Sequence, residues 1–380
     1  MNEPTLTLSV AAAALPEIFL TGAICLVLLV DVFAGAAGRR ITPTLTLVVL
    51  AVGAALTLAY AQPGTTVQLF SGTYVSDPLA VLLKLAGFLF VATGLLYSRH
   101  YLEARGILRG EYYVLALTAL LGMFVMISAG SLLTLYVGIE LLALSLYAMV
   151  AFDRDSGIAA EAAMKYFVLG AIASGALLYG MSLVYGLTGT LQLAEIAEAL
   201  QGEPSLGLVM GLVFLVVGVS FKFGAVPFHM WVPDVYHGAP SAVTLFVGTA
   251  PKLASFALAY RLFASGLAGV SESWVQMLSI VAALSMVIGN LVAIAQTNLK
   301  PMLAYSAIGN VGFILLGFVA GTEQGYQAAL YYTLVYVLMA LGSFGVILLA
   351  SRAGFEADEL AHYKGLHQRD PLLALIMMFL

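Results

Sequence analysis

The chain has 380 residues, of which 62% are hydrophobic and only 9% are Asp, Glu, Lys or Arg. About a quarter of the residues in a soluble domain are charged, so this composition cannot cover a water-facing surface and excludes a soluble globular protein. The single cysteine, Cys25, and the many apolar residues exclude the disulfide-rich and disordered classes. The composition therefore predicts an all-α polytopic membrane protein.

Apolar runs of about 20 residues, which cross the roughly 30 Å hydrocarbon core of a bilayer as helices, recur along the whole chain. They predict eleven full transmembrane helices and a truncated twelfth, which begins at Pro371 and is cut off at Leu380. The residues before Leu15 include no Lys or Arg, so the first span is predicted to be retained and not cleaved as a signal peptide. The predicted full spans are 15–34, 44–61, 79–97, 112–129, 132–152, 163–187, 207–228, 240–263, 274–295, 301–319 and 326–350.

Basic residues gather in the loops that follow the odd-numbered spans. The positive-inside rule therefore predicts that these loops face the cytoplasm and that the N-terminus lies outside. Only Arg261 is assigned to an even-numbered loop, and no basic stripe suggests nucleic-acid binding. The basic residues assigned to odd-numbered loops are Arg39, Arg40, Arg99, Arg105, Arg109, Arg154, Lys165, Lys300, Arg352, Lys364 and Arg369.

Three lysines remain inside predicted spans, and Lys84 is the first of them in the chain. It lies seven residues past Asp77, at the outer end of the third span. Its stem is long enough to carry the ammonium to the interface, so snorkelling and a functional role are equally consistent with the sequence.

Glu140 lies in the middle of the fifth span, with at least eight mostly apolar residues on either side. A charge at mid-bilayer costs about 2.5–3.5 kcal/mol, so the carboxyl group needs a buried partner or a proton. It is either a structural carboxyl hydrogen-bonded inside the bundle or a proton carrier. In the sixth span, Gly170, Ser174 and Gly175 predict a close-packing face.

The seventh span is predicted to be broken beside Lys222. Pro227 has no N–H and therefore frees the carbonyl of Phe223, and Gly224 loosens the same turn. A helix broken beside an ionisable group is typical of midplane ion sites in membrane proteins. The alternative is a proline kink kept for packing, with the lysine reaching the interface.

Two histidines and a third lysine follow this break. His229 and His237 could relay protons near neutral pH or simply cap a short re-entrant segment around Trp231. Pro251 opens a second helix, and Lys252 beside it lies near the middle of the eighth span.

These residue types can form a proton-transfer device. Desolvation lowers the pKa of a lysine and a neighbouring carboxylate raises it, so a buried lysine at a variable distance from a glutamate can hold or release a proton. Moving one charge against 100 mV costs about 2.3 kcal/mol, equivalent to fewer than two pKa units. We therefore expect Glu140 and Lys222 to form such a pair and Lys252 to receive the proton next. The sequence shows no metal, phosphate-binding or dinucleotide motif, so no redox or bond-breaking chemistry is expected in this chain.

The sequence also carries a weak internal repeat. At an offset of 166 residues, Ala162 and Tyr166 of the sixth span fall on Ala328 and Tyr332 of the eleventh. Five spans separate the copies, so they would be inverted, and Glu140 would lie opposite Ser306.

Three segments, EAAMKYFVLGAIASGALLYG, FKFGAVPFHMWVPDVYHGAPSAVTLF and NLKPMLAYSAIGNVGF, resemble the antiporter-like membrane subunits of respiratory complex I. The resemblance covers essentially the whole chain. L- and M-type subunits usually read Pro-Asp-Ala-Met where this chain has residues 233–236, Pro-Asp-Val-Tyr, so the N type of NADH-quinone oxidoreductase is favoured.

The resemblance implies fourteen helices in two inverted five-helix repeats, with helices seven and twelve broken and proton-carrying roles for Glu140, Lys222 and Lys252. It also implies an exit lysine in helix twelve, which this sequence does not assign. We expect an N-terminal three-helix segment over 1–110, a first repeat over 111–265 and an incomplete second repeat over 270–380.

By the same resemblance, other subunits would hold FMN, iron–sulfur clusters, NADH and quinone. K- and M-type subunits and the lateral helix of an L-type subunit would be its neighbours in a bacterial inner membrane. The expected function is proton translocation as part of an NADH:quinone oxidoreductase. Two alternatives stay open, a multisubunit cation/proton antiporter subunit and a non-transporting assembly scaffold.

Overall fold

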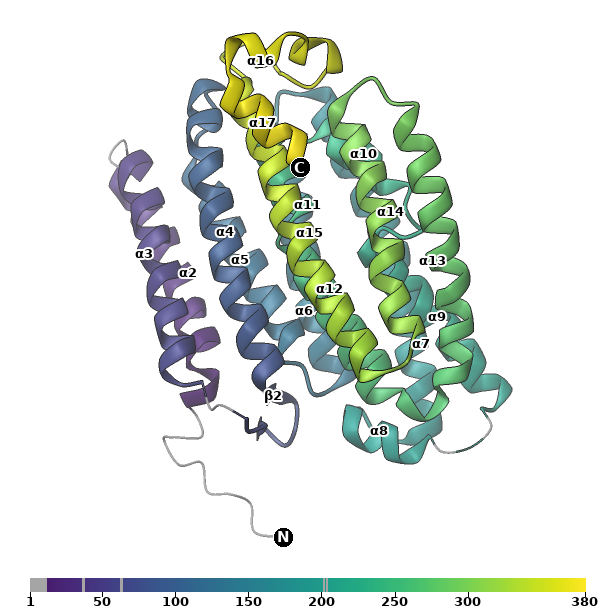
Figure 1. The fold of residues 1–380 in the computed structure, drawn as a ribbon. Coiled ribbons are helices and arrows are strands. Elements are labelled where there is room, and N and C mark those ends of the chain that lie inside the picture. The colour runs from purple at the N-terminus through teal and green to yellow at the C-terminus, as the bar shows by residue number, and fades with distance from the viewer. Residues whose placement is uncertain (1–11, 36–37, 62–63, 201, 203) are drawn as a thin grey trace.

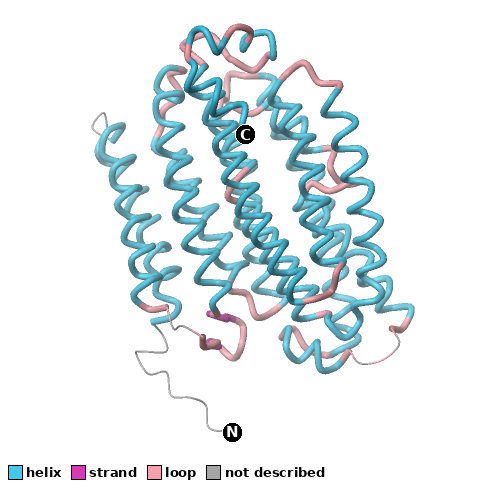
Figure 2. The backbone as a smooth tube through the Cα atoms, viewed as in Figure 1, coloured by secondary structure: helices cyan, strands magenta, loops and turns pink. Residues whose placement is uncertain are grey.

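The computed structural model describes residues 12–35, 38–61, 64–200, 202 and 204–380. Long helices run side by side between two ends of a bundle, one marked by α8 and β2 and the other by α16 (Figure 1). We refer to these as the α8 end and the α16 end. Helix accounts for nearly all of the chain between the two ends, and the strands lie at the α8 end (Figure 2).

The elements fall into long helices, halves of interrupted helices and short connecting pieces. The long helices are α2 (Leu15–Ala34), α3 (Gly38–Ala59), α4 (Pro78–Ala104), α5 (Gly110–Ile127), α6 (Leu132–Val150), α7 (Gly157–Thr188), α9 (Leu206–Phe223), α13 (Ser271–Ile294), α14 (Leu299–Val319) and α15 (Glu323–Ala350). The interrupted region comprises α10 (Trp231–Gly238), α11 (Ser241–Gly248), α12 (Pro251–Ala259) and the π-helical η3 (Tyr260–Gly266). The short pieces are η1 (Ala12–Ala14), β1 (Val67–Leu69), β2 (Tyr74–Ser76), α8 (Leu193–Ala199), η4 (Ala268–Val270), η5 (Leu360–Tyr363), α16 (Leu366–Arg369) and α17 (Pro371–Phe379).

The described residues contain 11 helical segments long and apolar enough to cross a membrane, which confirms the predicted number of full spans. Most of the predicted starts were late, by six residues at α3 and α7, which begin at Gly38 and Gly157, and by two at α14, which begins at Leu299. The twelfth helix begins at Pro371, as predicted.

Side-chain caps set several helix starts. Ser156 accepts a hydrogen bond from the Ala159 N–H at the start of α7, and Asn298 accepts one from the Lys300 N–H at the start of α14. Such caps satisfy N–H groups that have no partner within the helix. They explain why α7 and α14 extend beyond the apolar runs that hydropathy detects.

Close backbone contact joins α13 and α14. A Cβ added to Gly289 would lie 2.5 Å from the backbone nitrogen of Gly309, so glycine is required for this approach. Helices in a membrane associate by van der Waals packing and not by the hydrophobic effect, and small residues allow that packing.

A buried ion pair attaches the first helix to the bundle at the α8 end. Lys84 is 2% exposed, and its Nζ lies 2.5 Å from Glu17 Oε1 of α2. The same ammonium donates to the Tyr74 hydroxyl of β2 at 2.9 Å. The Lys84 ammonium is therefore held by a carboxylate from another helix and is not exposed to solvent.

A second buried pair lies at the same end. The Arg261 guanidinium donates two hydrogen bonds to Asp77, at 2.6 and 2.8 Å, and a third to the Ile127 carbonyl at 3.0 Å. Burial alone would raise the pKa of the Asp77 carboxyl, but the hydrogen bonds and charge of Arg261 outweigh it and hold that pKa below its usual value. The assignment of Arg261 to a loop is wrong, because Arg261 lies in η3 and is buried.

Six residues assigned to odd-numbered loops also lie in helices, namely Arg39, Arg40, Arg99, Lys165, Lys300 and Arg369. Lys165 is in α7, where it pairs with Glu161 at 2.9 Å and with Asp234 of α10 at 3.1 Å. Lys300 is the second residue of α14 and is 4% exposed. The apolar-run boundary left out Lys300, because an N-cap and not hydropathy defines where α14 begins. Lys165 already lies inside the predicted span 163–187 and was counted with the preceding loop.

We predict that Glu17→Gln destabilises the fold by about 3–5 kcal/mol, because it leaves the buried Lys84 ammonium without its carboxylate. The double variant Glu17→Gln/Lys84→Met should recover most of this loss, since it removes both charges. Thermal unfolding of the purified protein in detergent measures both effects.

Lys165→Met serves as the control, because it breaks ion pairs at an exposed site, where such pairs contribute little. Equal stability of the Glu17→Gln variant and the unsubstituted protein would contradict the prediction.

Candidate functional site

The seventh spanning helix is broken where the sequence predicts. Helix α9 ends at Phe223 because Gly224 adopts the left-handed conformation, with φ of 75°, and Pro227 cannot donate an N–H. The Gly224 N–H returns to the Phe221 carbonyl at 2.9 Å, and Trp231 Nε1 donates to the same carbonyl at 3.0 Å. The chain then continues as α10, so the break is built from defined hydrogen bonds.

The carbonyl at this break is the hydrogen-bond partner of Lys252. Pro251 begins α12, and the neighbouring Lys252 is 3% exposed. Its Nζ donates to Phe223 O at 2.5 Å. The two helix interruptions predicted from separate prolines therefore meet in one hydrogen bond.

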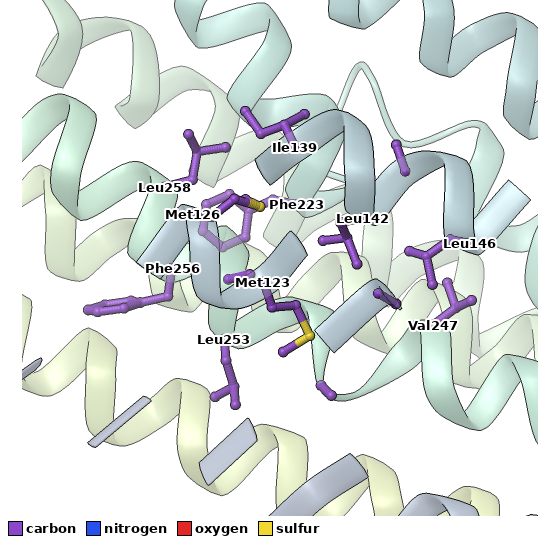
Figure 3. Packing of buried hydrophobic residues seen from close by; sticks show 14 of the residues in the cluster. Met123, Met126, Ile139, Leu142, Leu146, Phe223, Val247, Leu253, Phe256 and Leu258 are labelled. Carbon is purple, nitrogen blue, oxygen red and sulfur yellow. The ribbon is translucent and has the colours of Figure 1, made fainter. Parts of the chain in front are cut away.

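A small enclosed cavity lies between Lys222 and Lys252. Its volume is about 30 Å³, enough for a water molecule or two. Ser255 Oγ donates to the Lys222 carbonyl at 3.4 Å and also borders the cavity. Most of the remaining wall is apolar, and Figure 3 labels five of these wall residues, namely Met126, Ile139, Leu142, Leu146 and Val247.

Glu140 of α6 is half-buried and accepts a hydrogen bond from the Ser174 hydroxyl of α7. The face around Ser174 was predicted only to pack closely, so this hydrogen bond is an addition to that prediction. Among the described residues, no nitrogen–oxygen contact within 4.0 Å joins Glu140 to Lys222. The expected pair is therefore not in contact in this conformation.

The two histidines lie in different environments. His229 is half-buried, its Nδ1 has no hydrogen-bond partner among the described residues, and its ring centroid lies 6.5 Å from that of Tyr305. His237 is exposed and borders a large cavity at the α16 end. Only His229 is close to the helix break.

The sequence did not identify Lys300 as a candidate. Its Nζ donates to the Ala239 carbonyl at 2.8 Å, at the end of α10. The signal that could have found it is Asn298, a favourable N-cap that places the following lysine inside a helix. The end of α9 and the end of α10 thus each meet a buried lysine, Lys252 at Phe223 and Lys300 at Ala239.

This arrangement can bind and move protons. A lysine amine can gain or lose a proton without any other covalent bond changing. The Glu140 carboxylate can also accept a proton. In the described part of the chain, no group of three His, Cys, Asp or Glu side chains could hold a metal ion. The chemistry that these residues can perform is proton transfer.

Known proteins are similar to this chain over most of its length. The family described as "NADH:quinone oxidoreductase/Mrp antiporter, TM" matches residues 129–380. The NADH-quinone oxidoreductase subunit N of Thiobacillus denitrificans is 56% identical over 382 aligned residues, which cover 100% of this chain and 79% of the relative. The protein of the same name from Thioalkalivibrio sulfidiphilus is 55% identical over 369 residues, with 96% and 77% coverage.

A chain of respiratory complex I from Thermus thermophilus, solved with bound aureothin, has the same fold. It superimposes with a TM-score of 0.79 at 33% sequence identity, over 95% of this chain and 76% of that chain.

We predict that Gly224→Ala destabilises the protein more than Gly189→Ala, another substitution of a helix C-terminal glycine. Both glycines have positive φ values, 75° and 73°, so both substitutions strain the backbone by about 1 kcal/mol. Only at position 224 would the new Cβ also clash, at 2.5 Å from Val232 Cγ2. Thermal unfolding compares the two variants, and equal losses would show that the break tolerates a side chain.

Proposed function

The chain belongs to the family of NADH-quinone oxidoreductase subunit N, and we propose that Glu140, Lys222 and Lys252 carry protons through it. It is an integral membrane subunit of a proton-translocating NADH:quinone oxidoreductase and contributes to that enzyme as part of the translocase.

The observation that supports the proposed pathway is the cavity between Lys222 and Lys252. Water in this space would connect the two amines. The Lys252 Nζ donates to the carbonyl of Phe223, which cannot take the proton, so this bond is not itself a route of transfer. Release requires another N–H of Lys252 to meet water or a neutral amine.

Glu140 supplies the acceptor at the other side of Lys222. Its hydrogen bond from Ser174 stabilises the carboxylate, and the absence of a direct ion pair leaves room for the distance to Lys222 to change. Moving one charge across a membrane potential of 100 mV costs about 2.3 kcal/mol. A modest change in the distance between Glu140 and Lys222 can change the proton affinity of Lys222 by a similar free energy and so determine the direction of proton transfer. His229 beside the break is a candidate relay.

The wider assembly follows from family membership. FMN, iron–sulfur clusters, NADH and quinone would be bound by other subunits, and this chain would hold none of them. K- and M-type subunits, the lateral helix of an L-type subunit and lipid would cover its sides. The relatives are bacterial, so the inner membrane is the expected location, and the basic loops favour an N-terminus outside.

We predict that Lys222→Met slows the proton-transfer step through this subunit roughly 100-fold or more, because methionine fills similar space but binds no proton. The measurement is NADH-driven acidification of inverted membrane vesicles that contain the whole enzyme. Acidification at the unsubstituted rate would contradict the proposed role.

Lys364→Met is the matched control, since Lys364 is exposed at the α16 end and should leave pumping unchanged. Replacing sodium by choline in the same vesicles separates proton pumping, which should persist, from sodium/proton antiport.

A Glu140→Gln/Lys222→Met variant tests whether this chain carries protons at all. Retained pumping by the enzyme that contains this variant would favour a non-transporting scaffold role for this chain.

A further inference from the structure

The cavity between Lys222 and Lys252 can hold water only if its wall supplies hydrogen bonds. Its volume of about 30 Å³ admits a water molecule or two, and a buried water needs two to four polar partners. Besides the two lysines, the described residues that border it with a side-chain nitrogen or oxygen are Tyr166, Trp231 and Ser255. The Ser255 hydroxyl already donates to the Pro251 carbonyl at 3.2 Å or to the Lys222 carbonyl at 3.4 Å. The remaining hydroxyl on this wall is that of Tyr166.

Tyr166 is held at the wall of the cavity by aromatic packing. It lies on α7 and is 6% exposed. Its ring stacks on the Trp231 indole, with centroids 4.5 Å apart and planes 13° apart, and it meets the Tyr147 ring edge-on at 4.7 Å. Trp231 is itself fixed by the hydrogen bond that its Nε1 donates to the Phe221 carbonyl at 3.0 Å. The position of Tyr166 is therefore tied to the helix break beside Lys222.

The Tyr166 hydroxyl is not committed to another residue. It forms no hydrogen bond within the part of the chain that the structure describes. Tyr112, by comparison, is also buried but donates its hydroxyl to Ser98 at 3.0 Å. Buried polar atoms nearly always have a partner in the protein or in ordered water. The cavity that Tyr166 borders is the space where a water partner fits.

A backbone carbonyl on the same wall also lacks its helical partner. Val247 and Pro251 both border the cavity. A carbonyl in an α-helix accepts a hydrogen bond from the N–H four residues later, and Pro251, at that position, has no N–H. Among the described residues, no other backbone N–H bonds to the Val247 carbonyl. Buried carbonyls without a protein donor are satisfied by ordered water.

We propose that Tyr166 is a positioning residue for the transfer of a proton from Lys222 to Lys252. Its hydroxyl and the Val247 carbonyl hold the water through which the proton passes. The proposal rests on the proposed function and names the groups that keep its water in place.

The hydrogen bonds of this water are complete in both states of the transfer. Before transfer it accepts from the Lys222 ammonium and the Tyr166 hydroxyl, and it donates to the neutral Lys252 amine and the Val247 carbonyl. Lys222 then gives a proton to the water as the water gives one of its own to Lys252. One N–H bond breaks, one N–H bond forms and the water is regenerated. The bonds of the water to Tyr166 and Val247 are the same before and after.

Tyr166→Phe tests the hydroxyl, because it keeps the stacked ring and removes an oxygen that has no protein hydrogen bond to lose. NADH-driven acidification of inverted vesicles that contain the whole enzyme should fall roughly tenfold, the equivalent of one lost hydrogen bond. The ratio of the pumping rates in H₂O and D₂O should rise, because transfer through a poorly held water becomes the slow step. Thermal unfolding should be unchanged.

Tyr113→Phe is the matched control. Tyr113 of α5 is also buried with an unpartnered hydroxyl, but it does not border the cavity. Its pumping rate and its isotope ratio should both equal those of the unsubstituted enzyme.

Val247→Ile tests the water itself. The added methyl group would occupy much of a cavity of about 30 Å³ and would displace the water without removing a polar group. Pumping should fall at least as far as in Tyr166→Phe. If Val247→Ile does not assemble, Tyr166→Phe alone decides.

Normal pumping by Tyr166→Phe, or by an assembled Val247→Ile enzyme, would overturn the proposal. A slower Tyr166→Phe enzyme with an unchanged isotope ratio, or with a matching loss of thermal stability, would also overturn it, because the tyrosine would then serve only in packing. If Lys222→Met fails to pump in the same vesicles, the proposed function stands although the role of Tyr166 is wrong. If Lys222→Met also pumps normally, both proposals fail.

Discussion

The hydrogen bond from Lys252 to the Phe223 carbonyl joins two helix interruptions, and the centre of the molecule depends on it. Hydrocarbon supplies no water to satisfy a freed carbonyl or a buried ammonium, so each must find a partner within the protein. Here each satisfies the other. The same solution recurs at the C-terminal end of α10, where Lys300 meets the Ala239 carbonyl. The segment from the end of α9 to the end of α10 therefore meets a lysine at Phe223 and another at Ala239.

Four lysines, of which Lys84, Lys252 and Lys300 are buried and Lys222 is half-buried, fall into two kinds according to whether a carboxylate lies beside them. Lys84 has a carboxylate at 2.5 Å and a tyrosine hydroxyl at 2.9 Å, which fix its charge and attach the first helix to the bundle. Among the described residues, Lys222, Lys252 and Lys300 form no ion pair within 4.0 Å. A lysine with a fixed counter-ion is held in one charge state, whereas a lysine bound to a carbonyl or beside water is not. The lysines proposed to carry protons thus differ in geometry from Lys84, which has a fixed counter-ion.

Apolar runs alone predict the eleven spans. The thickness of the bilayer fixes the length of a spanning segment, and about 20 consecutive apolar residues can be recognised without knowing the rest of the sequence. The break at Gly224 and Pro227 was predictable for the same reason, since backbone chemistry at a proline is local. The pairs Glu17–Lys84 and Asp77–Arg261 join residues 67 and 184 positions apart, and no local pattern indicates such partners. Lys300 was missed because a polar cap, and not hydropathy, begins its helix.

The π-helical segment η3 lies in the eighth span, and its residues affect the directions in which side chains at the two ends of this span point. Lys252 faces the helix break, while Arg261, nine residues later, faces Asp77 and the end of α5. A π-helical turn holds an extra residue, which changes by about 100° the direction in which all later side chains point. Loss of Tyr260, the residue of η3 that precedes Arg261, would turn Arg261 by about 100° away from Asp77 without altering Lys252. The number of residues between Lys252 and Arg261 therefore acts as a register constraint between the helix break and the ion pair at the α8 end.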